Sequence, residues 1–332
     1  MDSLVINESL VRTLLHEQHP DVAGLPLRQV PGGWDNQLWR LGDDLAVRLP
    51  RTPRAPSLLR QEQKWLPVLA PRLPLPVPTP VRIGEPSAHF PSPWSIATWV
   101  PGEPGDRAPM SRAHHAADTL AGFLRSLHHE APAGAPANPN RGVPLDRLTQ
   151  EFDRRLRAVT SSGVAADVRG IWDEAVSAPT WEGPPVWLHG DLHPANFVVS
   201  AGTLSGVIDF GELCAGDPAT DLAAAWLLLP AGAAPRFFDA YEDVRADVDT
   251  DVDTDAGHAG SPGPATDQRM NLDAAIRRAR GWAALRAVSL IGIGQAWERG
   301  LPGGQPTWGL AGRTALARVL APPHKMVITR RA

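Results

Sequence analysis

Three polar residues between positions 186 and 223 have the types and the spacing of a phosphoryl-transfer site. Asp191 is followed five positions later by Asn196, and Asp209 lies further along the chain. Each of the three adjoins a short apolar run that predicts a strand, namely VWL, FVV and GVI. One carboxylate can orient an attacking hydroxyl and take its proton, while a second carboxylate and an amide oxygen can hold Mg²⁺ against nucleotide phosphates.

The segments around these residues are expected to bring them to one edge of a small hairpin. Pro194 prevents a helix in the middle of the loop between Asp191 and Asn196. The run AGTLS before GVI predicts a turn between two short strands. An Asp, an Asn five residues later and then an Asp-Phe-Gly segment is the order found in kinase catalytic sites. A polar loop beside a buried hairpin would explain each residue singly, but the joint pattern favours a kinase-like site.

A second group of candidate residues lies in a strand-rich segment near the N-terminus. The loop PGGWDN, with Gly32 and Gly33, stands between the strands predicted at 27–30 and at QLWRL. A Gly-rich loop in that position can fold over phosphates with its backbone N–H groups, although most such loops are plain hairpin turns. Arg48 lies on the next strand, LAVRLP, where kinases carry a Lys that binds the α- and β-phosphates. A guanidinium also binds phosphates, but it is bulkier and not interchangeable with Lys.

The helix predicted over 57–69 supplies a partner for Arg48. Gln61 and Glu62 are both candidates by position, and Glu62 is preferred because the kinase pattern needs a carboxylate. A solvated helix face is the alternative interpretation. Further on, WSIATWV predicts a strand that PGEPG ends, which places an inter-lobe hinge near 96–102.

The run HGDLHPAN, followed by VIDF and GDPATDLA, resembles the aminoglycoside phosphotransferase family of small-molecule kinases. The resemblance implies an α+β, two-lobed protein-kinase-like fold. A strand-rich nucleotide-binding lobe would cover residues 1–100, and a mainly helical catalytic and substrate-binding lobe would cover 101–332. It also implies that the main chain of Thr98, Trp99 and Val100 contacts the adenine.

The resemblance assigns a role to each candidate residue. Asp191 would orient or deprotonate the acceptor hydroxyl, and Asn196 and Asp209 would hold Mg²⁺. Arg48, steadied by Glu62, would hold the α- and β-phosphates of ATP or GTP. Structural support would come from His189, Asp217 and Asp221, with Asp221 bracing the catalytic loop from beneath and Asp217 capping a helix.

Composition limits the classes of partner. The chain has 332 residues, a net charge of −4 and a single cysteine, Cys214, so an intrachain disulfide is excluded. The charge does not suggest a nucleic-acid binder, and no apolar run approaches membrane-spanning length. No signal-peptide pattern is present at the N-terminus. We therefore expect a cytoplasmic protein with a small hydroxylated substrate and no nucleic-acid, membrane or protein partner.

The acceptor is the least determined feature. The resemblance suggests an aminoglycoside-like antibiotic or an amino alcohol, and with it a role in antibiotic resistance; a macrolide, a sugar or a choline-like compound is the alternative. Acidic residues that would suit a polycation are Glu212, Asp239, Glu242, Asp243 and Glu298. Tryptophans that would suit an apolar macrolide are Trp226, Trp282 and Trp297.

Two other classes of protein remain open. His189, Asp191 and His193 form an H-x-D-x-H pattern whose alternate residues fall on one side of an extended segment, as a metallohydrolase would require. That interpretation leaves Asn196 and the VIDFG segment unexplained. A catalytically inactive kinase fold acting as a binding module would usually lack the Asp or Asn residues, and here all three are present.

Apolar periodicity predicts a helical C-terminal region. Helices are expected over residues 3–19, 111–129 with Ser111 as cap, 146–160, 164–177, 217–229, 234–244, 271–299 and 308–320. The acidic, Gly- and Pro-rich run 245–268 predicts a disordered insertion.

Overall fold

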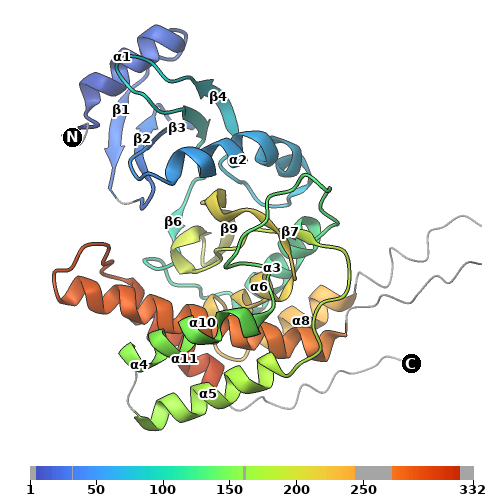
Figure 1. Ribbon diagram of the computed structural model, residues 1–332. Coiled ribbons are helices and arrows are strands. Elements are labelled where there is room, and N and C mark those ends of the chain that lie inside the picture. The colour runs from blue at the N-terminus through green and yellow to red at the C-terminus, as the bar shows by residue number, and fades with distance from the viewer. Residues whose placement is uncertain (1–4, 32, 160–161, 244–270, 322–332) are drawn as a thin grey trace, which may run out of the picture.

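The structure is a computed structural model that describes residues 5–31, 33–159, 162–243 and 271–321. The predicted insertion at 245–268 and the candidate phosphate-loop residue Gly32 lie outside the described residues. The large antiparallel sheet belongs to the N-terminal part of the chain and most helices to the C-terminal part, in agreement with the α+β prediction (Figure 1).

A five-stranded antiparallel sheet forms the N-terminal part of the molecule. Its order is β1-β2-β3-β5-β4, with bounds Leu27–Val30, Asn36–Leu41, Leu45–Pro50, Trp94–Thr98 and Pro80–Gly84 in that order. Val47 and Leu49 of β3 pack with the buried side of α1 (Glu8–Gln18). Because side chains alternate along a strand, Arg48 points to the opposite face. That face is covered by α2 (Ala55–Leu69), where Arg48 meets Glu62.

The C-terminal part is built around one long buried helix, α10 (Leu272–Glu298). The helices around it are α3 (Ala113–Leu127), α4 (Thr149–Val159), α5 (Ser162–Val176), α6 (Ala219–Leu222), α7 (Ala224–Leu227), α8 (Ala234–Asp243) and α11 (Trp308–Leu320). Short 3₁₀ turns lie at Ala70–Arg72, Leu145–Leu148, Pro194–Asn196 and Phe210–Glu212. α10 packs against α4, α5, α6, α7 and α11 (Figure 1), so one element is the scaffold for most of this part.

Two small sheets lie between the large sheet and the helices. β6 (Glu103–Pro104), β8 (Phe197–Ser200) and β9 (Thr203–Val207) form one of them, and β7 (Val186–Leu188) pairs with β10 (Cys214–Gly216) in the other. The strands predicted at VWL and FVV are therefore confirmed in β7 and β8. The third strand, β9, begins earlier than predicted, at Thr203 inside the run AGTLS, and ends at Val207, before Ile208. The division of the chain at residues 100 and 101 stays a proposal.

Two local predictions are wrong. Ser111 does not cap α3: the helix begins one residue after Arg112, and the Ser111 N–H donates to the Gly202 carbonyl at 3.0 Å. The helix expected over 217–229 is divided into α6 and α7 by a tight turn at Ala223. There the Trp226 N–H donates to the Ala223 carbonyl at 3.1 Å, a three-residue step that interrupts the regular helix.

No helix among the described residues is long and apolar enough to cross a membrane.

A close approach of α10 and α11 at glycines yields a stability prediction. A Cβ added to Gly294 would lie 2.2 Å from Gly309 Cα, whereas one added to Gly292 would meet only Val159 Cγ1 at 3.5 Å. Gly294→Ala should lower the unfolding free energy by about 1–3 kcal/mol, because the two helices must separate. Gly292→Ala, the matched control, should raise it by up to about 1 kcal/mol through helix propensity. Urea unfolding followed by circular dichroism measures both, and equal effects would contradict the proposed contact.

Candidate active site

Asp191 and Asn196 meet in the loop between β7 and β8. The Asn196 amide donates from Nδ2 to the Asp191 carbonyl oxygen at 2.9 Å and approaches Asp191 Oδ2 at 3.4 Å. Ile208 donates its N–H to the Asn196 carbonyl at 2.9 Å, so the residue before Asp209 lies beside the same turn. Asp191 and Asn196 are therefore in contact, and the backbone just before Asp209 lies beside them; the roles of the three residues stay a prediction.

A buried carboxylate beneath this loop fixes its path. Asp221, fully buried in α6, accepts the backbone N–H of His189 at 2.7 Å and that of Gly190 at 2.9 Å. The His189 ring in turn accepts the Asp191 N–H on Nδ1 at 3.2 Å and donates from Nε2 to the Ile208 carbonyl at 3.0 Å. Burial lowers the pKa of His189 and favours this neutral tautomer. The supporting positions predicted for Asp221 and His189 agree with these contacts.

Asp209 follows β9 in an unusual backbone conformation. Its φ is 64° and its ψ is 70°, in the left-handed region that non-glycine residues rarely adopt. The residue is exposed, and no hydrogen bond joins its carboxylate to any other side chain in the described ranges. A Cβ on Gly211 would lie 3.3 Å from Asp209 Oδ1 and 3.8 Å from Glu62 Oε1, so Asp209 and Glu62 face the same small space.

Arg48 and Glu62 form the predicted ion pair. Arg48 donates from Nη2 to Glu62 Oε1 at 3.1 Å, and from Nη1 to Oε2. Both side chains are buried, with relative exposures of 8% and 0%. Burial alone would lower the pKa of Arg48, but Glu62 outweighs it and raises that pKa. The guanidinium therefore stays charged and fixed between β3 and α2.

The Gly-rich loop is anchored by arginines that follow β3. Gly33 has a φ of 77°, and a Cβ there would lie 2.4 Å from the Asn36 carbonyl oxygen, so a larger residue would distort the loop. Arg51 donates to the Gly33 carbonyl, and its Nε donates to the Trp34 carbonyl at 3.1 Å.

Arg54 joins this loop to the segment after Asp209. It donates from Nη2 to Asp35 Oδ2 at 2.6 Å and from Nη1 to Glu212 Oε1 at 2.7 Å. The hydrogen bond that Arg54 donates to Asp35 is the largest influence on the Arg54 pKa, which is raised. Glu212 also accepts from Asn138 Nδ2 at 2.7 Å. One side chain thus connects both sides of the candidate site.

An aromatic contact reinforces this connection. Trp34, at the tip of the Gly-rich loop, stacks on Trp308 at the start of α11, with ring centroids 6.4 Å apart and planes 20° apart. Trp308 also contacts the His193 ring edge to face, at 4.5 Å between centroids. His193 Nε2 lies 3.6 Å from Asp191 Oδ2. The stack therefore lies beside the catalytic loop.

The Asp191 carboxylate is surrounded by cationic groups. Arg286 of α10 donates to Asp191 Oδ1, and Arg141 Nη2 lies 3.5 Å from the same oxygen. Burial would raise the pKa of Asp191, but Arg286, His193 and Arg141 together hold it well below the usual range. Asp191 is thus an ionised but weakly basic group.

The predicted hinge residues lie at the end of β5, whose last residue is Thr98. Thr98 donates its N–H to the Thr79 carbonyl at 2.9 Å, and Trp99 donates its N–H to the Asp44 carbonyl at 2.7 Å. A nucleotide base would therefore need other main-chain groups, such as the N–H of Val100, which has no acceptor within the described part of the chain. The assignment of these residues to the base stays a prediction.

Asp217 has a different role from a simple helix cap. Its Oδ1 accepts the Ala219 N–H at 3.0 Å, as a cap would. It also forms a buried ion pair with Arg278 of α10, with Nε to Oδ2 at 2.7 Å and Nη2 to Oδ1 at 3.2 Å. Arg278, which the sequence analysis missed, thereby ties α10 to the start of α6.

The metal-site alternative finds little support. His193 lies near the Asp191 carboxylate, but both ring nitrogens of His189 are hydrogen-bonded to the backbone of Asp191 and Ile208, so His189 does not join them in a metal site. Among the described residues no group of three or more His, Cys, Asp or Glu side chains is arranged to hold a metal ion.

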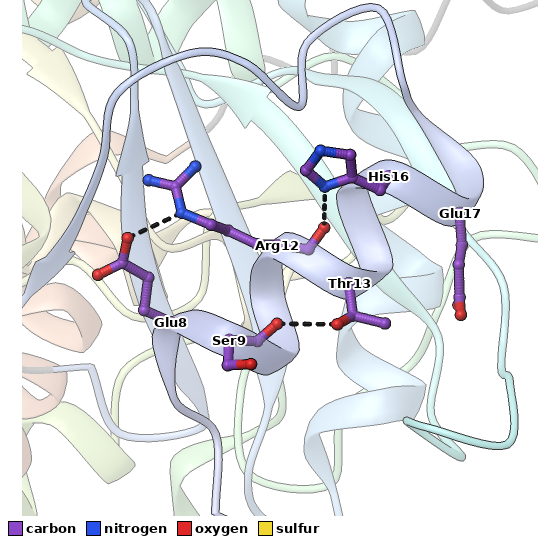
Figure 2. Close-up of a pocket in the computed structure, with 6 residues that line it drawn as sticks. All are labelled: Glu8, Ser9, Arg12, Thr13, His16 and Glu17. Atoms are coloured by element: carbon purple, nitrogen blue, oxygen red, sulfur yellow. Dashed lines mark hydrogen bonds and ion pairs between the residues drawn. The ribbon is translucent and has the colours of Figure 1, made fainter.

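A shallow depression along α1 is unrelated to this site. Figure 2 shows its lining, which comes from one helix: Glu8, Ser9, Arg12, Thr13, His16 and Glu17. Arg12 donates to Glu8 at 2.8 Å and Thr13 donates to the Ser9 carbonyl at 3.0 Å, so these polar groups are paired within the helix. The depression offers no group directed toward Asp191.

Comparison with known proteins identifies the family. A family model described as the phosphotransferase enzyme family matches residues 26–254, which is more than half of the chain. The chain therefore belongs to this family. A search of curated sequences found no match.

Solved structures support the fold. The GDP complex of aminoglycoside 2'-phosphotransferase-IIIa has a TM-score of 0.66 at 19% identity, over 95% of this chain and 99% of that one. A macrolide 2'-phosphotransferase from Brachybacterium faecium has a TM-score of 0.56 at 22% identity, over 95% and 99%. The predicted two-lobed protein-kinase-like fold is confirmed by these similarities.

The Arg48–Glu62 pair provides a stability test. Glu62→Gln leaves a buried guanidinium without its counter-charge and should lower the unfolding free energy by about 3–5 kcal/mol. The double variant Arg48→Met/Glu62→Leu removes both charges and should recover most of that loss. Urea unfolding compares the variants with wild type, and a double variant no more stable than Glu62→Gln would contradict the pairing.

The aromatic stack provides a second test. Trp34→Ala removes the contact that holds the Gly-rich loop against α11, and an aromatic pair is worth about 0.5–1.5 kcal/mol. Nucleotide affinity, measured by calorimetry, should therefore fall by up to about tenfold. Trp297→Ala at the end of α10, where the ring is 55% exposed, is the control and should bind nucleotide as wild type does. Equal affinities for wild type and Trp34→Ala would show that the stack does not position the loop.

Proposed function

We propose that the protein transfers the γ-phosphoryl group of ATP or GTP to a hydroxyl of a small molecule. The observation that carries this proposal is the convergence of Asp191, Asn196 and Asp209, with the Arg48–Glu62 pair facing the same space. Family membership supports a phosphotransferase, and solved relatives of similar fold are described as GDP and ADP complexes. The predicted N-terminal and C-terminal lobes would enclose the nucleotide between them.

The nucleotide side of the site would use fixed charges. Arg48, held by Glu62, would bind the α- and β-phosphates, and the backbone of the loop with Gly32 and Gly33 would cover them. Thr98, Trp99 and Val100 form the proposed edge that contacts the base.

Asn196 and Asp209 fit a Mg²⁺ ion. Asn196 donates from Nδ2 to the Asp191 carbonyl, and no described residue donates to the amide oxygen of Asn196. The exposed Asp209 carboxylate supplies a second oxygen. Oxygen donors are the ligands that Mg²⁺ prefers. When bound, the ion would neutralise charge on the transferring phosphoryl group.

Asp191 would orient the acceptor hydroxyl. The hydroxyl oxygen forms the new bond to the γ-phosphorus as the bond to the β,γ-bridging oxygen breaks, and the nucleoside diphosphate leaves. The hydroxyl proton passes to Asp191. Because the pKa of Asp191 is low, transfer of this proton would occur late, as a loose transition state allows. Positioning is then the larger part of its contribution.

An aminoglycoside-like antibiotic or an amino alcohol is the acceptor suggested by the sequence, with macrolides, sugars and choline-like compounds as alternatives. Structures of similar fold are described as complexes with kanamycin, gentamicin and streptomycin. An antibiotic-resistance role and a cytoplasmic location belong to this proposal. The location is proposed because the donor is a nucleoside triphosphate.

Two carboxylate variants test the assignment of roles. Asp209→Asn should abolish the Mg²⁺-dependent rise in Tm with ATP or GTP, because the metal loses a charged ligand. Asp191→Asn should keep that rise but lower turnover by about 10²–10⁴-fold. Asp167→Asn, at an exposed position on α5, is the control and should behave as wild type. Stabilisation of wild type by Zn²⁺ alone, with no response to nucleotide, would instead favour a metallohydrolase.

A further inference from the structure

Two arginines face the Asp191 carboxylate. Arg141 and Arg286 both approach its Oδ1, and neither forms an ion pair with any other acid in the described part of the chain. Arg286 also donates to the Gly190 carbonyl at 3.0 Å. Glu212, a second carboxylate that acts on Arg141, is already engaged by Arg54. Two guanidinium groups therefore share one carboxylate as their ion-pair partner.

Both arginines are largely withdrawn from water. Their side chains are 18% and 15% exposed, for Arg141 and Arg286 respectively. The pKa of Arg141 is lowered to about 10, mainly by burial and secondly by the positive charge of Arg286. Crowding two partly desolvated cations is costly, and such an arrangement is typical of a functional site rather than of a structural ion pair.

Arg141 also has a donor without an acceptor. Its Nη1 donates to the Asn140 carbonyl at 2.8 Å, but its buried Nε has no hydrogen-bond partner among the described residues. Buried donors are almost always satisfied, so this unused N–H marks Arg141 as incompletely paired.

The two oxygens of Asp191 separate the arginines from the metal ligand. Oδ2 lies 3.4 Å from Asn196 Nδ2 and 3.6 Å from His193 Nε2, whereas Oδ1 faces Arg141 and Arg286. Asn196 marks the side that Mg²⁺ and the phosphates would occupy. The arginines therefore lie on the other side of Asp191, which is left for the acceptor.

We propose that Arg141 and Arg286 form an anion-binding subsite for the acceptor. The inference rests on the proposed function, since it requires an acceptor hydroxyl at Asp191. The acceptor would carry a carboxylate or phosphate group near its reacting hydroxyl. Guanidinium groups bind such anions with paired N–H donors, and a bound anion would release Asp191 Oδ1 to orient the hydroxyl. A polycationic aminoglycoside would meet like charges at the same position and would bind poorly.

Sulfate, measured by titration calorimetry on the full chain, is a suitable probe of this subsite. Its Kd should rise at least tenfold in Arg286→Gln and in Arg141→Gln. Asp191→Asn should bind sulfate more tightly than wild type, because the competing carboxylate charge is removed. Arg236→Gln, an exposed arginine paired with Asp118, is the matched control and should leave the Kd unchanged. Equal Kd values in wild type, Arg286→Gln, Arg141→Gln and Asp191→Asn would overturn the proposal. The opposite responses of Arg141→Gln and Asp191→Asn keep the test informative even if Arg286→Gln fails to fold.

Sulfate titrations with bound nucleotide distinguish an acceptor subsite from a site for the transferring phosphoryl group. Sulfate should still bind in the presence of Mg²⁺ with either ADP or a non-hydrolysable ATP analogue. Loss of sulfate binding with the ATP analogue alone would assign the arginines to the γ-phosphoryl group and overturn the acceptor subsite. A wild-type protein whose Tm does not respond to nucleotide and Mg²⁺ would refute the proposed function, whereas sulfate binding to the variants would still report on the arginine pair.

Discussion

The geometry of the site depends on the buried carboxylate of Asp221. A carboxylate removed from water is stable only when its oxygens are hydrogen-bonded, and here the N–H groups of His189 and Gly190 satisfy them. This requirement fixes the backbone where β7 ends. His189 then extends the constraint, because its ring contacts the Asp191 N–H on one side and the Ile208 carbonyl on the other. One acid and one neutral histidine therefore set the spacing between Asp191 and Asp209.

The large sheet supplies an independent constraint on the opposite side of the site. Strand alternation forces Arg48 away from the α1 core and toward α2, where only a carboxylate can compensate a buried guanidinium. Gly211 lies close to α2, since a Cβ there would be 3.3 Å from Asp209 Oδ1 and in van der Waals contact with Leu58 and Glu62. Arg54 completes the link, since it bonds the Gly-rich loop through Asp35 and the segment after Asp209 through Glu212.

Residues that are close in sequence could be predicted, and residues joined only by the tertiary fold could not. Asp191, Asn196 and Asp209 stand at fixed spacing in one hairpin, so a local pattern is enough to bring them together. The same holds for the helix that carries Glu62 and for most of the C-terminal helices, whose apolar periodicity reflects burial. The prediction that Ser111 caps a helix failed because the helix starts at Ala113. The Ser111 backbone N–H binds the distant Gly202 carbonyl instead, which no local pattern indicates.

Arg286 shows why the rest escaped prediction. It lies in the middle of a helix whose pattern indicates burial, 95 residues from Asp191 in sequence, and no local signal connects the two. Trp34 and Trp308 are likewise joined only when the Gly-rich loop meets the start of α11.

These distant contacts bear most strongly on specificity. Fold similarity at 19–22% identity supports a shared scaffold and does not identify an acceptor. The acids that suggested a polycation are not gathered at Asp191: Glu212 is paired with Arg54, while Asp239 and Glu242 are exposed on α8. The charges that do surround Asp191 are positive. With Asp191 in its proposed role, electrostatic complementarity there favours the anionic acceptor that we propose.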